Sequence, residues 1–112
     1  MKTKTNELEG AALDWAVAKA NQAAGLFKSD PMLDYMRYFT PSTNWMQAGP
    51  IIEREDCWPT RYYGAAAHRG KVYQASQGTG AYSQGPTPLI AAMRCYVASK
   101  LGAEVDVPEE LL

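Results

Sequence analysis

The sequence contains only two cysteines, one histidine and no long apolar run. Cys57 and Cys95 are isolated and form no disulfide-scaffold pattern, which is typical of a protein from a reducing compartment. No stretch approaches the ~20 apolar residues that a membrane-spanning helix needs. The first residues start like a signal peptide, but Glu7 and Glu9 follow where its apolar segment would be. We therefore expect a soluble cytoplasmic protein that does not contact a membrane.

Catalytic and metal-binding patterns are also scarce. His68 is the only histidine and lies beside a predicted turn, so no Ser-His-Asp or Cys-His arrangement can be assembled. Metal ligands do not occur at a recognisable spacing, and we expect neither a metal nor a cofactor. The carboxylates of Glu53, Glu55 and Asp56 are more typical of a solvated helix end than of a catalytic pair. Whether the protein is an enzyme stays open, but the sequence favours a binding protein without catalytic activity.

The chain also lacks an excess of positive charge. Lysine and arginine number 11 and acidic residues 12, which gives a formal net charge of −1. Nucleic-acid binding needs a basic footprint, so we expect no nucleic-acid partner. The length of 112 residues and the hydrophobic content of 46% indicate a single globular domain spanning residues 1–112.

What the sequence specifies best is a helix over residues 88–101. Thr87 can cap it through its hydroxyl, Pro88 suits its first position, and Gly102 suits the turn that ends it. One face is apolar and the opposite face is small and uncharged. The apolar stripe consists of Ile90, Met93, Val97 and Leu101, and the small residues are Ala92, Cys95 and Ser99. Because so little charge is present, we expect this helix to be covered on more than one side.

The remaining elements predict an α+β fold in which helices pack on a small antiparallel sheet. A capping box of Asn6 and Glu9 predicts a helix over about 7–24 that ends at Gly25. A short helical turn is expected over 29–38, and a further helix over about 43–54, with either a kink or a new start at Pro50. Residues 60–77 predict a hairpin. The acidic end, 104–112, is either a short edge strand or an extended arm.

Two uncharged faces on each long helix also predict self-association, most simply as a dimer. A chain of 112 residues has little interior in which to cover all four faces. One of these helices spans about 7–24 and the other 88–101. The expected partner is a second copy of the chain.

A glycine-rich segment, 77–86, leads into the helix that starts after Thr87. Glycines let backbone amides approach a ligand closely, and a helix N-terminus attracts anions, although an ordinary connecting loop has the same composition. Trp45 and Trp58 could stack on a planar ligand, and a small protein also buries such side chains in its core. Arg94 borders the apolar stripe and must find an acid, a carbonyl or a ligand anion. The candidate ligand-binding residues are Thr43, Asn44, Trp45, Trp58, Gly78, Gly80, Thr87 and Arg94.

Three segments together resemble the NinX-like family of lambdoid phages and prophages. They are Gly10–Lys19, Pro41–Trp45 with Gly49–Arg54, and Gly85–Lys100, and the resemblance covers nearly the whole chain in the same order. The middle pattern and the last helix are similar, more loosely, to the phage α-β-α sandwich domain. The first resemblance implies a phage accessory protein, and the second implies helices over a small antiparallel sheet.

The resemblance implies that the protein acts in the cytoplasm of an infected bacterium, where small phage proteins commonly counter host defences. We expect sequestration of a small, anionic, nucleotide-derived signalling molecule without catalysis. The alternative is a protein that binds and inhibits a host protein, and a nucleotide hydrolase is third. Sequestration requires Trp45, Thr87 and Arg94 around one cavity, whereas docking on a host protein requires an exposed aromatic patch.

Overall fold

The structure is a computed structural model that describes residues 1–112 except 27, 29–30, 32–34, 64–71, 79 and 81. Within the described residues the helices are α1 (Gly10–Ala23), α2 (Trp45–Glu55) and α3 (Pro88–Leu101). The strands are β1 (Lys2–Lys4), β2 (Pro59–Tyr62), β3 (Val72–Ser76), β4 (Tyr82–Gly85) and β5 (Glu104–Asp106). Short 3-10 turns occur at η1 (Thr5–Glu7), η2 (Tyr35–Arg37) and η4 (Glu109–Leu111). The predicted α+β class is confirmed.

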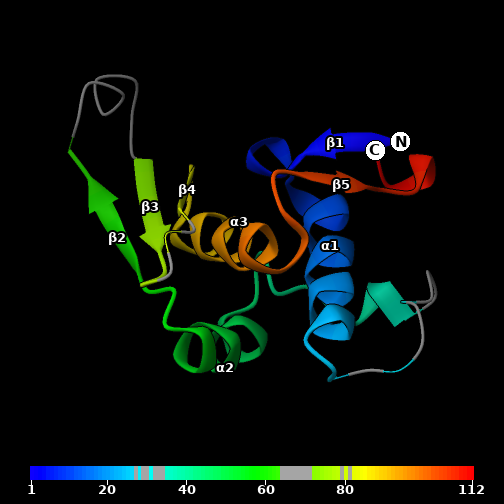
Figure 1. The fold of residues 1–112 in the computed structure, drawn as a ribbon, viewed down its shortest axis with the longest axis horizontal. Helices are drawn as coiled ribbons and strands as arrows, with labels where there is room; N and C mark the ends of the chain where they lie inside the picture. Colours follow the sequence, from blue (N-terminus) through cyan, green and yellow to red (C-terminus); the bar gives the residue numbers. More distant parts are fainter. Residues whose placement is uncertain (27, 29–30, 32–34, 64–71, 79, 81) are drawn as a thin grey trace.

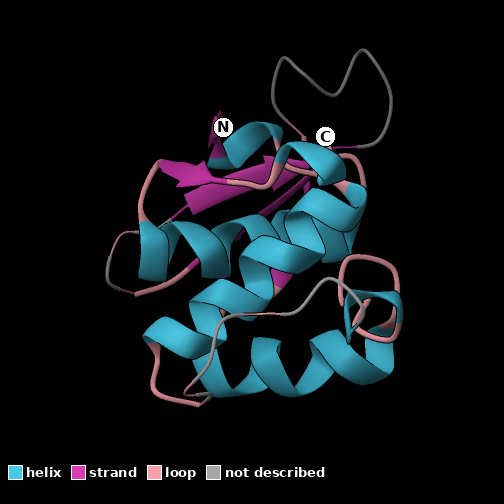
Figure 2. Cartoon of the chain, turned by 90° about the vertical axis from the view of Figure 1, so that its right-hand side faces the viewer, coloured by secondary structure: helices cyan, strands magenta, loops and turns pink. Residues whose placement is uncertain are grey.

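Helix α3 lies at the centre of the fold (Figure 1). One side contacts the antiparallel sheet β2-β3-β4, and the other contacts α1 and α2. A separate two-stranded sheet pairs β1 with β5, and both chain ends lie together beside it (Figure 1 and Figure 2). The central position of α3 explains why its sequence carries so little charge.

Burial confirms the reasoning from the sequence of α3. Met93 and Val97 on the apolar stripe are fully buried, and so are Ala92 and Cys95 on the opposite face. The hydroxyl of Thr87 accepts a hydrogen bond from the Ile90 amide at 3.1 Å, as expected of a cap. Because most of α1 is buried too, both long helices are covered within one chain. Their faces therefore do not require a second copy, and self-association stays a prediction.

Helix α1 begins at Gly10, so the capping box predicted at Asn6 and Glu9 is wrong. Thr5 is tied to the far end of the chain, because its hydroxyl donates to the Gly102 carbonyl at 2.7 Å and its amide to the Ala103 carbonyl at 2.8 Å. Leu8 is buried in the core. These long-range contacts hold residues 5–8 away from the helical path that local capping would favour.

The glycine-rich segment 77–86 is not a single loop, because its second half is strand β4. Ser83 and Gly85 are buried, whereas Tyr82, which alternates with them, is exposed. This alternation is the two-residue period of a strand with one covered face. The predicted hairpin is confirmed as β2 and β3, in the register Thr60↔Gln74, and its turn at 64–71 lies outside the described residues.

The remaining predictions are met with small shifts. Helix α2 spans Trp45–Glu55 instead of 43–54 and continues through Pro50 without a new start. Of the helical turn expected over 29–38, the described part is η2. The C-terminal segment forms an edge strand, β5, whose partner β1 was not predicted. Among the described residues no helix is long and apolar enough to cross a membrane.

Candidate functional site

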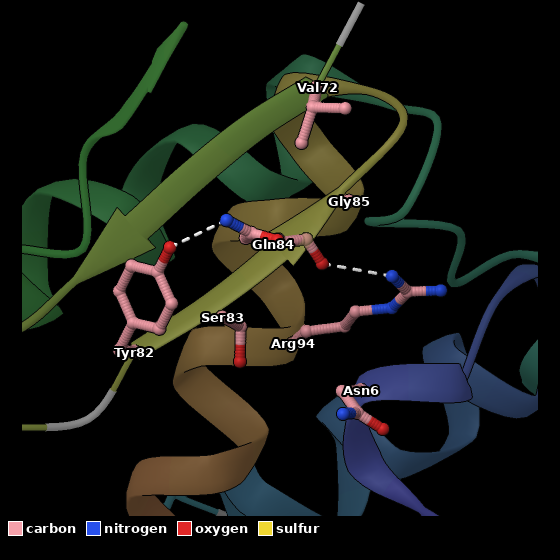
Figure 3. Close-up of a pocket in the computed structure, with 7 residues that line it drawn as sticks. All are labelled: Asn6, Val72, Tyr82, Ser83, Gln84, Gly85 and Arg94. Carbon is pink, nitrogen blue, oxygen red and sulfur yellow. Dashed lines mark hydrogen bonds between the residues drawn. The ribbon is translucent and has the colours of Figure 1, made fainter. Parts of the chain in front are cut away.

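Two adjoining hollows lie along the outer edge of β4, and together they form what we call the β4 groove. The first hollow, of about 370 Å³, is lined by Asn6, Val72, Tyr82, Ser83, Gln84, Gly85 and Arg94 (Figure 3). The second, of about 280 Å³, is lined by Lys4, Thr5, Asn6, Tyr82, Ser83, Ala98, Ala103 and Glu104. Asn6, Tyr82 and Ser83 belong to both. One wall is therefore strand β4, and the opposite wall is the segment of residues 4–6.

Arg94 reaches from α3 into the wall of this groove and is only 8% exposed. Its Nε donates to the Leu8 carbonyl at 2.7 Å, and its Nη1 donates to the Gln84 carbonyl at 2.9 Å (Figure 3). The sequence left an acid, a carbonyl or a ligand anion as possible partners of Arg94, and the structure shows two backbone carbonyl oxygens. The guanidinium thereby joins the segment just before α1 to β4 at one end of the groove.

The charge around Arg94 is mixed. Burial lowers the pKa of its guanidinium, and the nearby carboxylates of Glu9 and Glu7 only partly offset this lowering. Lys4 and Glu104 add one charge of each sign to the second hollow. The groove therefore does not present the concentrated positive charge that attracts a highly anionic ligand.

The exposed side of β4 carries an ordered polar row. The Tyr82 hydroxyl donates to Gln74 Oε1 at 3.0 Å, and Gln84 Nε2 donates to the Tyr82 hydroxyl at 2.7 Å. These bonds fix the Tyr82 ring beside the strand, as Figure 3 shows. The side chains at the rim of the groove are thus already positioned before anything binds.

Gly85 is required for β4 to lie on the first turn of α3. An added Cβ would lie 2.8 Å from the Ala91 backbone nitrogen and 2.9 Å from the Ile90 Cγ2. Both distances are shorter than ordinary van der Waals contact. From the sequence, the glycines of this segment indicated access for a ligand, but this one provides close packing of strand on helix.

The other predicted site residues lie elsewhere. Of the eight residues predicted to bind a ligand, Arg94 is the one that lines a described hollow. Gly78 and Gly80 belong to the turn between β3 and β4, where the Gly80 amide donates to the Gln77 carbonyl at 3.0 Å. Thr87 caps α3 as described above. His68 lies outside the described residues.

Thr43, Asn44 and Trp45 lie around the start of α2. The Asn44 side chain accepts a hydrogen bond from the Met46 amide at 2.9 Å, so Asn44 is the cap of this helix. Thr43 and Trp45 are exposed, and so is Trp58 beyond the other end of α2. The sequence thus identified residues that stand at helix ends, but these do not converge with Arg94 on one described cavity.

Large apolar side chains are exposed around the first turn of α2. Tyr38 is 69% exposed, Trp45 57% and Met46 87%, and we call these three residues the α2 patch. Gln47 of α2 holds the segment of Tyr38 against this helix, because its Nε2 donates to the Tyr38 carbonyl at 2.7 Å and its Oε1 accepts from the Thr40 amide at 2.6 Å. The patch is therefore built on an ordered frame.

A polar cluster joins the three helices on the side away from β4. The Tyr96 hydroxyl donates to Asn21 Oδ1 at 2.6 Å and accepts from Arg54 Nη2 at 3.1 Å. Glu55 pairs with Arg54 Nε at 2.9 Å and with Lys100 Nζ at 3.2 Å. Burial opposes the charge of Glu55, but these partners outweigh it and lower the pKa of its carboxyl. Glu55, expected on a solvated helix end, instead binds α2 to α3.

The buried titratable groups do not supply a nucleophile. Burial raises the pKa of the Cys57 thiol to about 12 and that of Cys95 to about 11, so both stay protonated near neutral pH. Burial also raises the pKa of Asp14, although the hydrogen bond from the Ser42 backbone amide partly offsets this. The Asp14 carboxylate accepts from the Ser42 amide at 2.8 Å, which ties the turn before α2 to α1. Among the described residues no group of three potential ligands could hold a metal ion.

Comparison with models of known protein families identifies a relative of this chain. The model of the family described as "Bacteriophage P22, NinX" matches residues 4–100. The matched region contains both walls of the β4 groove from residue 4 to Arg94, and the α2 patch. No curated protein matches the chain.

Proposed function

The chain belongs to the NinX family of phage P22, and we propose that it is a phage accessory protein that counters a host defence by binding a host protein. The α2 patch carries this proposal. Trp, Tyr and Met side chains are enriched where proteins bind one another, and the three in this patch are more than half exposed. Binding would take place in the cytoplasm of the infected cell.

The mode of action is binding without catalysis. The two described thiols are held in the protonated form, and the buried carboxylate of Asp14 is engaged with the Ser42 amide. A partner that buries the α2 patch needs no such groups, because apolar area removed from water supplies the attraction. Inhibition would follow from occupying a surface that the host protein uses.

The test compares variants that differ only on the surface. We would express tagged protein during infection and compare wild type with the double variant Trp45→Ser, Met46→Ser. The control is Tyr63→Ser, which removes a side chain that is 81% exposed and follows β2 instead of preceding α2. We expect one host protein to be retained by wild type and by the control and to be lost by the double variant. After purification, that host protein should also bind wild type and the control more tightly than it binds the double variant. Equal retention by all three forms would contradict the proposal.

A second candidate is sequestration of a nucleotide-derived signalling molecule, and the first hollow of the β4 groove favours it. Its volume of about 370 Å³ lies within the ordinary range of small-molecule sites. Arg94 Nη2 donates no hydrogen bond among the described residues and could meet a phosphate, while Tyr82, instead of Trp45, could stack on a base. Glu7 and Glu9 beside Arg94 work against an anion here, which is why we place this candidate second.

Calorimetry with cyclic and linear nucleotides, including ADP-ribose derivatives, tests the second candidate. Asn6→Ala and Tyr82→Ala should weaken binding, and Tyr63→Ala should not, because only the first two residues line the hollow. A second measurement denatures protein isolated from infected cells and identifies any small molecule that it releases. A released molecule that is chemically intact would support sequestration. A chemically altered molecule would instead indicate a nucleotide hydrolase, and no heat from any nucleotide would remove the candidate.

A further inference from the structure

The outer edge of β4 offers unpaired backbone groups to the groove. In the sheet order β2-β3-β4, strand β4 pairs on one side only. The Gln84 carbonyl points away from β3, because it receives the Arg94 guanidinium from outside the sheet (Figure 3). In an antiparallel pair the N–H and C=O of one residue point to the same side. The Gln84 N–H therefore faces the groove, and the backbone groups of Tyr82, two residues earlier, face the same way.

The opposite edge of this sheet is less suited to such pairing. Gln84 lies opposite Gln74, so Gln74 directs its backbone groups to β2 and bonds with Thr60 there. Pro59 and Arg61 consequently face outward on β2. Proline has no N–H to offer, and proline and charged residues are typical of protected edge strands. Of the two edges of this sheet, β4 is the one without a proline, and the groove lies beside it.

The two hollows, of about 370 and 280 Å³, lie along this edge between β4 and residues 4–6. Because Arg94 already donates to the Gln84 carbonyl, a segment added here would pair with the Gln84 N–H and with Tyr82 and would end at that point. Four of the residues that line the two hollows have small side chains or none: Ser83, Gly85, Ala98 and Ala103. Small residues leave space for one apolar side chain that points inward from a bound segment.

We propose that the β4 groove binds an extended segment of a partner protein, which adds to the sheet as a strand alongside β4. The segment would accept from the Gln84 N–H and bond with the backbone of Tyr82, while Asn6 contacts it from the opposite wall. Backbone bonds of this kind give affinity, and the side chain on the floor gives selectivity. The mixed charge of the groove suits a peptide backbone better than a highly charged small molecule. This site is separate from the α2 patch.

Hydrogen exchange gives a first test without any partner. The Gln84 amide should exchange faster than those of Ser83 and Gly85, which lie in the pairs with Ala75 and Tyr73. Equal protection of Gln84 would show that its N–H is already bonded and would overturn the proposal.

A matched pair of variants tests the binding itself. Gln84→Pro removes the outward N–H, and Gln84→Ala removes the same side chain but keeps that N–H. Ala103→Trp fills the second hollow from an exposed position. The probes are peptides selected on the wild-type protein from a displayed library of short random sequences and then synthesised.

The expected result is that Gln84→Pro binds the selected peptides roughly five- to tenfold more weakly than Gln84→Ala, as the loss of one backbone bond implies. Ala103→Trp should also bind the selected peptides more weakly than wild type does. If Gln84→Pro does not fold, this comparison tests the proposal in its place. Failure to select any peptide, or equal binding by all three variants, would overturn the proposal. Such a failure would leave the α2 patch untouched, because that surface is tested through Trp45 and Met46.

Discussion

An alanine at Gly85 tests how closely β4 is held against α3. The added methyl group would lie 2.8 Å from the Ala91 backbone nitrogen and 2.9 Å from the Ile90 Cγ2. The Ile90 methyl group can rotate away, but the Ala91 nitrogen belongs to the helix backbone and cannot. Either β4 must shift or the helix must, and overpacking of this kind costs about 1–3 kcal/mol. We therefore expect Gly85→Ala to lower the free energy of unfolding by that amount.

Thermal unfolding followed by circular dichroism would measure this loss, which corresponds to roughly 3–15 °C in a domain of this size. Gly78→Ala is the control, because Gly78 lies in the turn after β3 with a φ outside the left-handed region, and an added Cβ there meets no atom of non-neighbouring residues within 4 Å. We expect this variant to be as stable as wild type or up to about 1 kcal/mol more stable. A Gly85→Ala protein as stable as wild type would show that β4 does not lie on α3 as described.

Other predictions concern the core and the titratable groups. Met93→Ala should cost about 2–5 kcal/mol in urea denaturation, because the side chain is fully buried, and an unchanged midpoint would contradict its place in the core. The raised pKa of Asp14 means that the folded protein binds this proton more tightly than the unfolded chain. Wild type should therefore lose stability relative to Asp14→Asn as pH rises from below the unfolded pKa through the folded one. The lowered pKa of Glu55 has the opposite sign, so the advantage of wild type over Glu55→Gln should be present near neutrality and disappear as pH falls through the folded pKa. Identical pH profiles for wild type and either variant would contradict these assignments. Cys57 and Cys95 should react with a thiol reagent only after unfolding, and fast reaction of the native protein would show that they are accessible.

The parts of the fold that the sequence predicts correctly are those whose signals are local. Thr87, Pro88 and Gly102 define both ends of α3 within one segment, and its low charge indicates burial on two sides. The start of α1 was missed because Thr5 bonds to Gly102 and Ala103, which a local capping pattern does not register. Contacts of such long sequence separation override propensity.

Strand β4 was missed for a related reason. Glycine and serine are poor strand formers by composition, and only the packing of Ser83 and Gly85 on α3 gives them this conformation. The alternation of the large residues Tyr82 and Gln84 with the small residues Ser83 and Gly85, just before a capped helix, is the sequence signal that could have revealed it. β1 depends on pairing with β5 at the other end of the chain, and no local pattern marks it.

For the candidate site, the sequence identified Arg94 correctly as a buried charge in need of partners. It did not identify Asn6 or Tyr82, which line both hollows, because their convergence depends on how β4 and residues 4–6 fold together. Trp45 was selected for stacking, but its exposure beside Met46 better suits contact with another protein.

Native mass spectrometry of the tagged protein, isolated from infected host cells without denaturation, tests the central claim most directly. The account predicts a complex with a host protein that forms with wild type and Tyr63→Ser and is lost from the Trp45→Ser, Met46→Ser variant. A protein that carries only a bound small molecule, retained by the double variant and lost from Tyr82→Ala, would contradict the claim in favour of sequestration.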